Sequence, residues 1–282
     1  MNAIEIKNLN KKYDNFELKD ISLNVKKGSI MGLIGENGAG KTTILKCILS
    51  ISKYDGEILV LGEKININTK ENINAVLDDV FLSEYLNPYE IESILSGIYK
   101  NWDSNYYFEL LDKFKINIKK DIKDFSKGMK VKLKIATALS SKPKLLILDE
   151  PTAGLDPVVR DEILDILLEF VEDEENSVLI SSHITNDLEK IADYITFVED
   201  GRLIFSEDKY ELLENYAILR TSEEDFKNVD RSFVERYKIN KYNTEALITN
   251  VEKFKIKYPN LIVDKLDLDE MMVFYAKGNK YE

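Results

Sequence analysis

The sequence predicts an α/β fold, and three local patterns lead to that prediction. An apolar run at 30–34 precedes a glycine-rich loop, and apolar residues at helical spacing follow the loop. Two further apolar runs, at 145–148 and 177–182, read as buried strands, and a helix-like segment follows each of them. Buried strands that alternate with helices indicate a sheet whose faces are covered by those helices.

The N-terminal residues are expected to be strands. Apolar and polar residues alternate from Ile4 to Val25, and residues 26–29 read as the turn before the run at 30–34. Residues 54–62 add a turn and a short strand. We therefore predict an antiparallel β subdomain at this end of the chain.

The glycine-rich loop fits the pattern G-x-x-x-x-G-K-[ST] and opens a helix. Its glycines let several backbone N–H groups point at one anion, and the helix start adds its positive dipole end. Lys41 is expected to reach the β- and γ-phosphates of a nucleotide, and the Thr42 hydroxyl to ligate Mg²⁺. The predicted nucleotide-binding residues are Gly35, Glu36, Asn37, Gly38, Ala39, Gly40, Lys41, Thr42 and Thr43.

The middle of the chain reads as mostly helical over 66–134, with Pro88 and Gly97 as interruptions. The strand at 145–148 then ends at Asp149 and Glu150, where open α/β sheets place their ligand sites. Asp149 is expected to help hold Mg²⁺, and Glu150 to act as general base on the attacking water. The alternative interpretation is an ordinary acidic pair at a strand end.

The segments that follow are a helix over 160–171, the strand at 177–182, a helix over 186–194, and a hairpin of 195–198 with 203–205. Composition changes after the hairpin, because glycine is absent between Gly201 and Gly278. We place a boundary near 207–222 and predict two domains, 1–215 and 216–282. The second is expected to be a small α/β appendage with strands near 217–220 and 261–266.

Composition limits the classes of function. The 282 residues carry a net charge of -12, which argues against a general nucleic-acid binder with a basic face. The single cysteine, Cys47, cannot form an internal disulfide and is expected to be a small buried apolar residue. The start of the chain lacks a signal-peptide pattern, and no apolar run approaches the ~18 residues of a membrane span. Any membrane role is therefore expected to go through a partner.

With these motifs in place, the chain resembles the nucleotide-binding domain of ATP-binding cassette (ABC) proteins over about residues 1–220. The segment FSKGMK at 125–130 resembles the family signature LSGGQ, with Ser126 and Gly128 matching and lysine and methionine at two other positions. The resemblance implies that Ser126 and Gly128 touch ATP held by the opposite subunit. The alternative interpretation of Ser126 is a helix N-cap followed by solvated lysines.

Three more segments occur in the order of the family. Residues 150–157 resemble the family segment that meets the partner subunit, with Asp156 at the contact. His183, the only histidine of the sequence, follows the strand at 177–182, at the position of the family's switch histidine. His183 is thereby implied to contact the γ-phosphate. Tyr13 resembles the aromatic residue that stacks on adenine, with a buried strand-edge tyrosine as the alternative.

The sequence departs from the family at the glutamine loop. Asp78 aligns with the usual glutamine, with Asp79 as the alternative. A carboxylate is a suitable Mg²⁺ ligand, so we expect Asp78 to join Thr42 and Asp149 at the metal.

Taken together, the resemblance implies a P-loop NTPase core with an N-terminal antiparallel β subdomain, a helical signature subdomain near 80–140, and the C-terminal appendage. Two such domains, identical or different, would close around ATP and Mg²⁺, and hydrolysis would reopen them. The expected protein is an ATPase subunit, cytoplasmic and peripheral on the inner face of the cell membrane, that powers a separate transmembrane permease of the exporter type. The tail resembles accessory segments that end in a helix near 268–275.

Two other classes are weighed against this expectation. An ABC ATPase that acts on the ribosome or another cytosolic assembly usually has tandem cassettes and a basic linker, whereas this chain has one cassette and is acidic. A chromosome or repair ATPase needs long heptads between the phosphate loop and the signature, and that interval holds none.

Overall fold

The computed structural model describes residues 1–77 and 83–280, and its contacts divide the chain into two units. The larger unit comprises Met1–His183 and Ile191–Ser206, and the C-terminal unit comprises Ile184–Lys190 and Glu207–Glu282. The assignment of two domains at 1–215 and 216–282 stays a prediction.

A three-stranded antiparallel sheet opens the larger unit. Strand β1 (Asn2–Lys12) lies between β2 (Glu17–Lys26) and β4 (Asp55–Val60). The alternation predicted from Ile4 to Val25 is present, because the apolar residues are buried and most of their polar neighbours are not. These side chains pack with helix α1 (Lys41–Ile48) in one hydrophobic core.

The central sheet has six strands in the order β5-β6-β7-β3-β8-β9. Their bounds are β5 Ile73–Val76, β6 Leu145–Asp149, β7 Ser177–Ser181, β3 Ile30–Ile34, β8 Tyr194–Glu199 and β9 Arg202–Asp208. Pairings among β5, β6, β7, β3 and β8 are parallel, and every residue of β3, β6 and β7 is buried. Strands buried on both faces read as continuous apolar runs, which is why these three were recognisable in the sequence.

The region 66–134 is less helical than its sequence suggests. It contains the short helix α2 (Ile67–Lys70) and then β5, an edge strand that pairs in parallel with β6. The prediction of a mostly helical segment is therefore wrong for residues 73–76. Four residues are too few to show a strand period, and their partner lies about 70 residues further along the chain.

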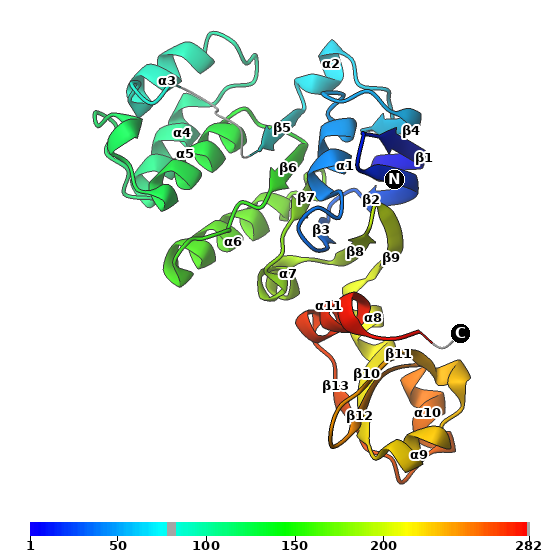
Figure 1. Cartoon of the computed structure of the whole chain (residues 1–282). Coiled ribbons are helices and arrows are strands. Elements are labelled where there is room, and N and C mark those ends of the chain that lie inside the picture. The colour runs from blue at the N-terminus through cyan, green and yellow to red at the C-terminus, as the bar shows by residue number, and fades with distance from the viewer. Residues whose placement is uncertain (78–82, 281–282) are drawn as a thin grey trace. The chain divides into compact units, whose positions relative to one another are not determined.

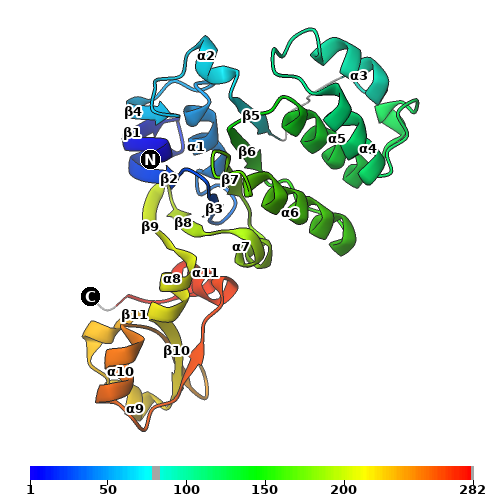
Figure 2. The ribbon, with the colours of Figure 1, turned by 180° about the vertical axis from the view of Figure 1, so that it is seen from behind.

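Helices α3 (Pro88–Leu95), α4 (Ser104–Lys113) and α5 (Lys127–Ser140), with the short η1 (Ile122–Asp124), gather beyond β5 at one end of the larger unit (Figures 1 and 2). Pro88 starts α3 rather than interrupting a helix, because proline is well tolerated in the first turn. A capping box between Asn87 and Glu90 fixes that start. Helix α6 (Pro157–Val171) follows β6, and α7 (Thr185–Ile191) connects β7 to β8.

The C-terminal unit has a four-stranded antiparallel sheet in the order β11-β12-β10-β13. Along the chain its elements are α8 Lys209–Asn215, β10 Tyr216–Thr221, α9 Glu223–Lys227, η2 Arg231–Phe233, β11 Val234–Ile239, β12 Thr244–Thr249, α10 Val251–Lys257, β13 Val263–Lys265 and α11 Leu268–Lys277. From β10 to β13 this is the β-α-β-β-α-β arrangement of ferredoxin-like domains. Helices α9 and α10 cover one face of the sheet through Phe226 and Phe254 (Figure 2). The predicted strands near 217–220 and 261–266 are present, whereas β11 and β12 were not predicted.

Candidate active site

The glycine-rich loop joins β3 to α1, as the sequence predicts, and two of its glycines are required by close approach. A Cβ atom on Gly35 would lie 2.3 Å from the carbonyl oxygen of Val198, and one on Gly40 would lie 2.6 Å from Cδ2 of Leu18. Gly40 is also the N-cap of α1, with φ of 113°. Glycine is the residue that fits this backbone without strain.

The loop borders a cavity of about 510 Å³. This volume is within the range of small-molecule sites. The lining residues are Asn15, Phe16, Glu36, Asn37, Gly38, Gly40, Lys41, Thr42, Thr43 and Glu150. Sequence reasoning missed Asn15 and Phe16, which sit in the turn between β1 and β2 and have no motif of their own.

Lys41 points back onto its own loop. Its Nζ donates to the carbonyl oxygens of Gly35, at 2.8 Å, and Glu36, at 3.3 Å, and the side chain is only 6% exposed. The same Nζ lies 3.4 Å from Oε1 of Glu150. The lysine therefore stands between the loop and the strand-end carboxylate, where an anion bound to the loop N–H groups would meet it.

Asp149 is the most firmly held acidic side chain of the site. Its Oδ2 accepts from the Thr42 hydroxyl at 2.8 Å, and its Oδ1 accepts from the Ser181 hydroxyl at 2.6 Å. Asp149 and Ser181 are direct neighbours in the parallel pairing of β6 and β7. Ser181 was not identified from the sequence, and its signal is a polar side chain ending an apolar strand beside the strand of Asp149.

Glu150 adopts a left-handed backbone conformation, with φ of 49°. Its N–H donates to both the carbonyl oxygen and the hydroxyl of Ser181, at 3.1 and 3.0 Å. Its Oε2 accepts from the His183 N–H at 3.2 Å and lies 2.5 Å from Nδ1 of His183. Such a conformation costs a non-glycine residue about 1–2 kcal/mol, so these contacts are needed to hold the carboxylate beside the cavity.

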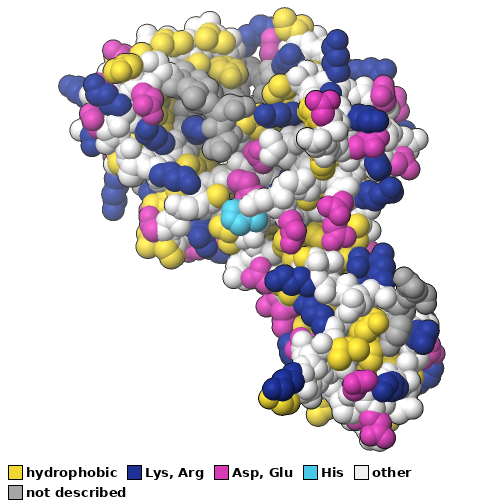
Figure 3. Space-filling view, viewed as in Figure 1, with side chains coloured by type: hydrophobic (Ala, Val, Ile, Leu, Met, Phe, Trp, Pro, Cys, Tyr) yellow, Lys and Arg dark blue, Asp and Glu magenta, His cyan; other side chains and the backbone are white. Residues whose placement is uncertain are grey.

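The two oxygens of Glu150 differ in their surroundings. Oε2 is occupied by His183, whereas Oε1 is buried and accepts no hydrogen bond from the part of the chain that the structure describes. The nearest charged group to Oε1 among the described residues is the Lys41 ammonium, at 3.4 Å. His183 itself is about half exposed, and Figure 3 shows the histidine in cyan at the surface of the larger unit.

The residues present fit a magnesium ion. The Thr42 hydroxyl and the Asp149 carboxylate are adjacent hard oxygen donors at the mouth of the phosphate loop, and Mg²⁺ binds through one or two such groups together with substrate phosphates. Asp78 and its alternative Asp79 lie outside the described residues, so their expected place at the metal stays a prediction.

Ser126 and Gly128 occupy the start of α5. The Ser126 hydroxyl accepts from the Met129 N–H at 3.3 Å, which makes it the N-cap of the helix, as the alternative interpretation has it. Gly128 packs closely on Val159, since a Cβ atom there would lie 3.2 Å from Cγ1 of that valine. Neither residue is among those that line the cavity at the phosphate loop.

Tyr13 follows β1 and is 44% exposed. Its hydroxyl lies 3.2 Å from the hydroxyl of Ser52, and the Lys11 ammonium lies 4.9 Å from its ring centre. The alternative of a buried strand-edge tyrosine is therefore wrong, while stacking on adenine stays a prediction. Cys47 is fully buried in α1, and burial raises the pKa of its thiol to about 11, as expected of a structural residue.

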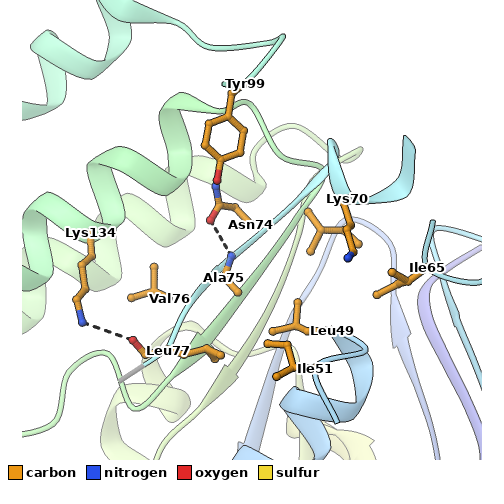
Figure 4. A pocket seen from close by; sticks show the side chains of 11 residues that line it. Leu49, Ile51, Ile65, Lys70, Asn74, Ala75, Val76, Leu77, Tyr99 and Lys134 are labelled. Atoms are coloured by element: carbon orange, nitrogen blue, oxygen red, sulfur yellow. Dashed lines mark hydrogen bonds between the residues drawn. The ribbon is translucent and has the colours of Figure 1, made fainter. Parts of the chain in front are cut away.

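A second cavity, of about 360 Å³, lies along β5 in the larger unit (Figure 4). Its lining is mostly apolar and includes Leu49, Ile65, Val76 and Leu77. Leu77 is the last described residue before Asp78, the expected glutamine-loop position. Its carbonyl oxygen accepts from Nζ of Lys134 at 3.5 Å.

Among residues 1–77 and 83–280, no helix combines the length and apolar character needed to cross a membrane.

The chain is similar to known ATP-binding proteins of transporters. A family profile described as ABC transporter matches residues 18–153. The chain is 37% identical over 218 residues to the ABC transporter ATP-binding protein YtrB of Bacillus subtilis, covering 76% of this chain and 74% of that protein.

Two further likenesses cover most of the compared protein. The lantibiotic transport ATP-binding protein SrtF of Streptococcus pyogenes is 37% identical over 216 residues, covering 75% of this chain and 93% of SrtF. The structure of cbiO1 from Clostridium perfringens, part of the ABC transporter complex cbiONQ, superposes with a TM-score of 0.65 at 26% identity. That likeness covers 76% of this chain and 91% of cbiO1.

Proposed function

This chain belongs to the family of ABC transporter ATP-binding proteins, and from that membership we propose that its larger unit binds Mg²⁺ and ATP and hydrolyses ATP to drive a separate transmembrane permease. One observation carries the assignment of the site. Three segments far apart in the sequence meet beside the phosphate-loop cavity, where hydrogen bonds and ion pairs join their side chains. These side chains are Lys41, Thr42, Asp149, Glu150 and His183.

Binding uses groups that the loop already presents. The backbone N–H groups of the glycine-rich loop and the start of α1 receive the phosphates, and Lys41 exchanges its contacts with Gly35 and Glu36 for phosphate oxygens. Mg²⁺, when bound by Thr42 and Asp149, supplies positive charge that offsets the charge of the β- and γ-phosphates. Ser181 keeps the Asp149 carboxylate oriented toward Thr42.

Hydrolysis requires a base and a group that orients it. Oε1 of Glu150 accepts a proton from the water that attacks the γ-phosphorus, once Lys41, whose Nζ lies 3.4 Å from this oxygen, has moved to the phosphates. His183 contacts the other oxygen of Glu150 and fixes the carboxylate. The same ring is exposed enough to meet the γ-phosphate as the bond to the leaving oxygen breaks.

The complete site is proposed to need a second cassette. Ser126 and Gly128 are not among the residues that line the cavity of their own chain, which supports their acting on ATP held by a partner cassette. Contacts made only in the closed pair would drive closure. Moving such an equilibrium from 1:99 to 99:1 takes about 5.5 kcal/mol of differential binding. The pair is formed by two copies of this chain or by this chain and a similar one, and Asp156 lies at the contact.

The permease is proposed to meet the larger unit at the apolar cavity beside β5, directly before the expected glutamine-loop position at Asp78. The proposal thus includes a location on the inner face of the cell membrane, with attachment through the partner. The names of SrtF and of the bacitracin transport protein BcrA of Enterococcus faecalis, which is 35% identical over 209 residues, support a transporter for antimicrobial peptides that works as an exporter.

Replacing Glu150 with glutamine tests the hydrolytic role. The variant Glu150→Gln keeps the shape of the side chain and loses the base, so turnover should fall by about 10²–10⁴-fold while ATP binding persists. Steady-state phosphate release and nucleotide titration measure the two quantities. The matched control is Glu172→Gln, at an exposed residue that follows α6. Turnover within twofold of the original chain in Glu150→Gln would refute the role of Glu150 as base.

A further inference from the structure

The segment directly after His183 packs with the C-terminal unit. The chain leaves the larger unit at the peptide bond between His183 and Ile184 and returns to it at the bond between Lys190 and Ile191. The segment between these two bonds contains most of helix α7, which connects two strands of the central sheet. Its contacts therefore decide what holds the backbone next to His183.

Hydrogen bonds of Thr185 and Glu189 tie this segment to helices of the C-terminal unit. The Thr185 hydroxyl donates to Oδ1 of Asp269 at 2.5 Å, and Thr185 is fully buried. Oε1 of Glu189 accepts from the N–H of Leu268, the first residue of α11, at 2.6 Å. The carbonyl oxygen of Glu189 accepts from Nζ of Lys209, which is 5% exposed, at 2.7 Å. Two of the three thus reach the first turn of α11, and one reaches α8.

Helix α11 is in turn fixed to the sheet of the C-terminal unit. Arg236 and Lys238 of β11 lie over the rings of Tyr275 and Phe274, at 5.0 and 4.4 Å from the ring centres. The residues just after the helix continue this attachment, because Asn279 and Tyr237 exchange two backbone hydrogen bonds. A displacement of α11 therefore acts on the whole unit.

At the other side of the peptide bond, His183 is bound to the larger unit. Its N–H and its ring both contact Oε2 of Glu150, and the preceding N–H, of Ser182, donates to the carbonyl oxygen of Leu33. Residues 182–193 contain no glycine, so none of them has the wider backbone freedom of that residue. Thr185 follows His183 by two residues, so the chain itself joins the two sets of contacts.

We propose that the C-terminal unit positions His183 against Glu150, with Thr185 and Glu189 as the positioning residues and the first turn of α11 as their anchor. ATP hydrolysis by the larger unit then depends on the contacts of α11, none of whose residues is among those that line the phosphate-loop cavity. This inference rests on the proposed function of Glu150 and His183. It gives the appendage a role in the reaction step rather than in nucleotide binding.

The test uses pairs of variants in the full chain. Thr185→Val removes the hydroxyl at nearly constant volume, whereas Thr185→Ser keeps it. Glu189→Ala removes the acceptor for the Leu268 N–H, whereas Glu189→Gln keeps a carbonyl oxygen in its place. The valine and alanine variants should lower kcat for ATP about 10-fold, because small misplacements of catalytic groups are costly, while KM for ATP stays unchanged. The serine and glutamine variants should restore kcat.

A second readout does not depend on hydrolysis. Amide hydrogen exchange, measured without nucleotide on a fragment spanning residues 181–185, should be faster in Thr185→Val, because the His183 N–H spends less time on Glu150. The control is Asp230→Asn, which breaks an ion pair of 2.6 Å with Lys257 inside the same C-terminal unit and does not touch α7 or α11. This control should leave both kcat and the exchange of that fragment unchanged.

The outcomes separate this inference from the proposed function. Unchanged exchange, unchanged kcat in an active enzyme, or an equal loss of kcat in Asp230→Asn would each overturn the positioning role. Absence of ATP hydrolysis in the original chain would instead refute the proposed function, and the exchange measurement would still decide whether α11 holds His183.

Discussion

Replacing Ser181 with alanine tests the best-buried polar contact of the site. The Ser181 side chain is fully buried at the end of β7, and its hydroxyl donates to Oδ1 of Asp149 at 2.6 Å. The same hydroxyl accepts from the Glu150 N–H, which has a second acceptor in the carbonyl oxygen of Ser181. The substitution Ser181→Ala therefore leaves one carboxylate oxygen without this donor and leaves the amide satisfied.

The size of the effect follows from the charge of the acceptor. A hydrogen bond to a charged group contributes about 1.5–3 kcal/mol to the free energy of unfolding. In a unit of 150–250 residues, each kcal/mol lowers Tm by about 2–4 °C, so the unfolding transition of the larger unit should fall by about 3–12 °C. Turnover should fall as well, because Asp149 loses the group that directs it toward Thr42 and the proposed Mg²⁺ ion.

Thermal unfolding and a Mg²⁺ titration of phosphate release measure these effects. The matched control is Ser140→Ala, since Ser140 is equally buried but donates to a neutral carbonyl oxygen, that of Ala136 in its own helix. That control should cost at most about 1 kcal/mol. If Ser181→Ala unfolds at the temperature of the original chain with an unchanged Mg²⁺ requirement, the reasoning about Asp149 is wrong.

Three further predictions concern the phosphate loop and its helix. Lys41→Ala should abolish ATP binding in calorimetric titration, and normal binding would remove the phosphate assignment. Gly40→Ala should destabilise the larger unit by more than about 1 kcal/mol and weaken ATP binding, because φ is 113° and the new Cβ atom would lie 2.6 Å from Leu18. Denaturant unfolding with an unchanged midpoint would contradict this expectation. Burial raises the pKa of Cys47 to about 11, so the thiol stays protonated as the pH rises from 7 to 9. Iodoacetamide should therefore label Cys47 only in unfolded protein, and equal labelling rates in folded and unfolded protein would be inconsistent with this burial.

Local signals in the sequence were sufficient to predict the elements that carry the core of the candidate site. Strands β3, β6 and β7 are buried on both faces and read as apolar runs, and the phosphate loop carries its own spacing. These features place Lys41, Thr42, Asp149 and Glu150 correctly at strand ends and a helix start. The site was predictable to this extent because the sequence pattern of each element lies within about ten residues.

Elements defined by distant partners were not predictable. Strand β11 is half-buried along nearly its whole length and carries charged residues, so it shows no alternation. Ser181 became visible only through its pairing with Asp149, which depends on the register of two strands. The contacts of Thr185 and Glu189 with α11 join residues about 80 positions apart, and no short pattern encodes them. Long-range packing supplied these features.

The most direct test of the central claim is the mass of the Glu150→Gln variant in solution with ATP and Mg²⁺, measured by light scattering during size-exclusion chromatography. With its base removed, the chain should keep ATP bound and associate with a second cassette, either another copy or the similar chain that accompanies it. The mass should then double from that of a single chain and return to it when ATP is withdrawn. A single-chain mass at every ATP concentration, with either partner present, would contradict the account.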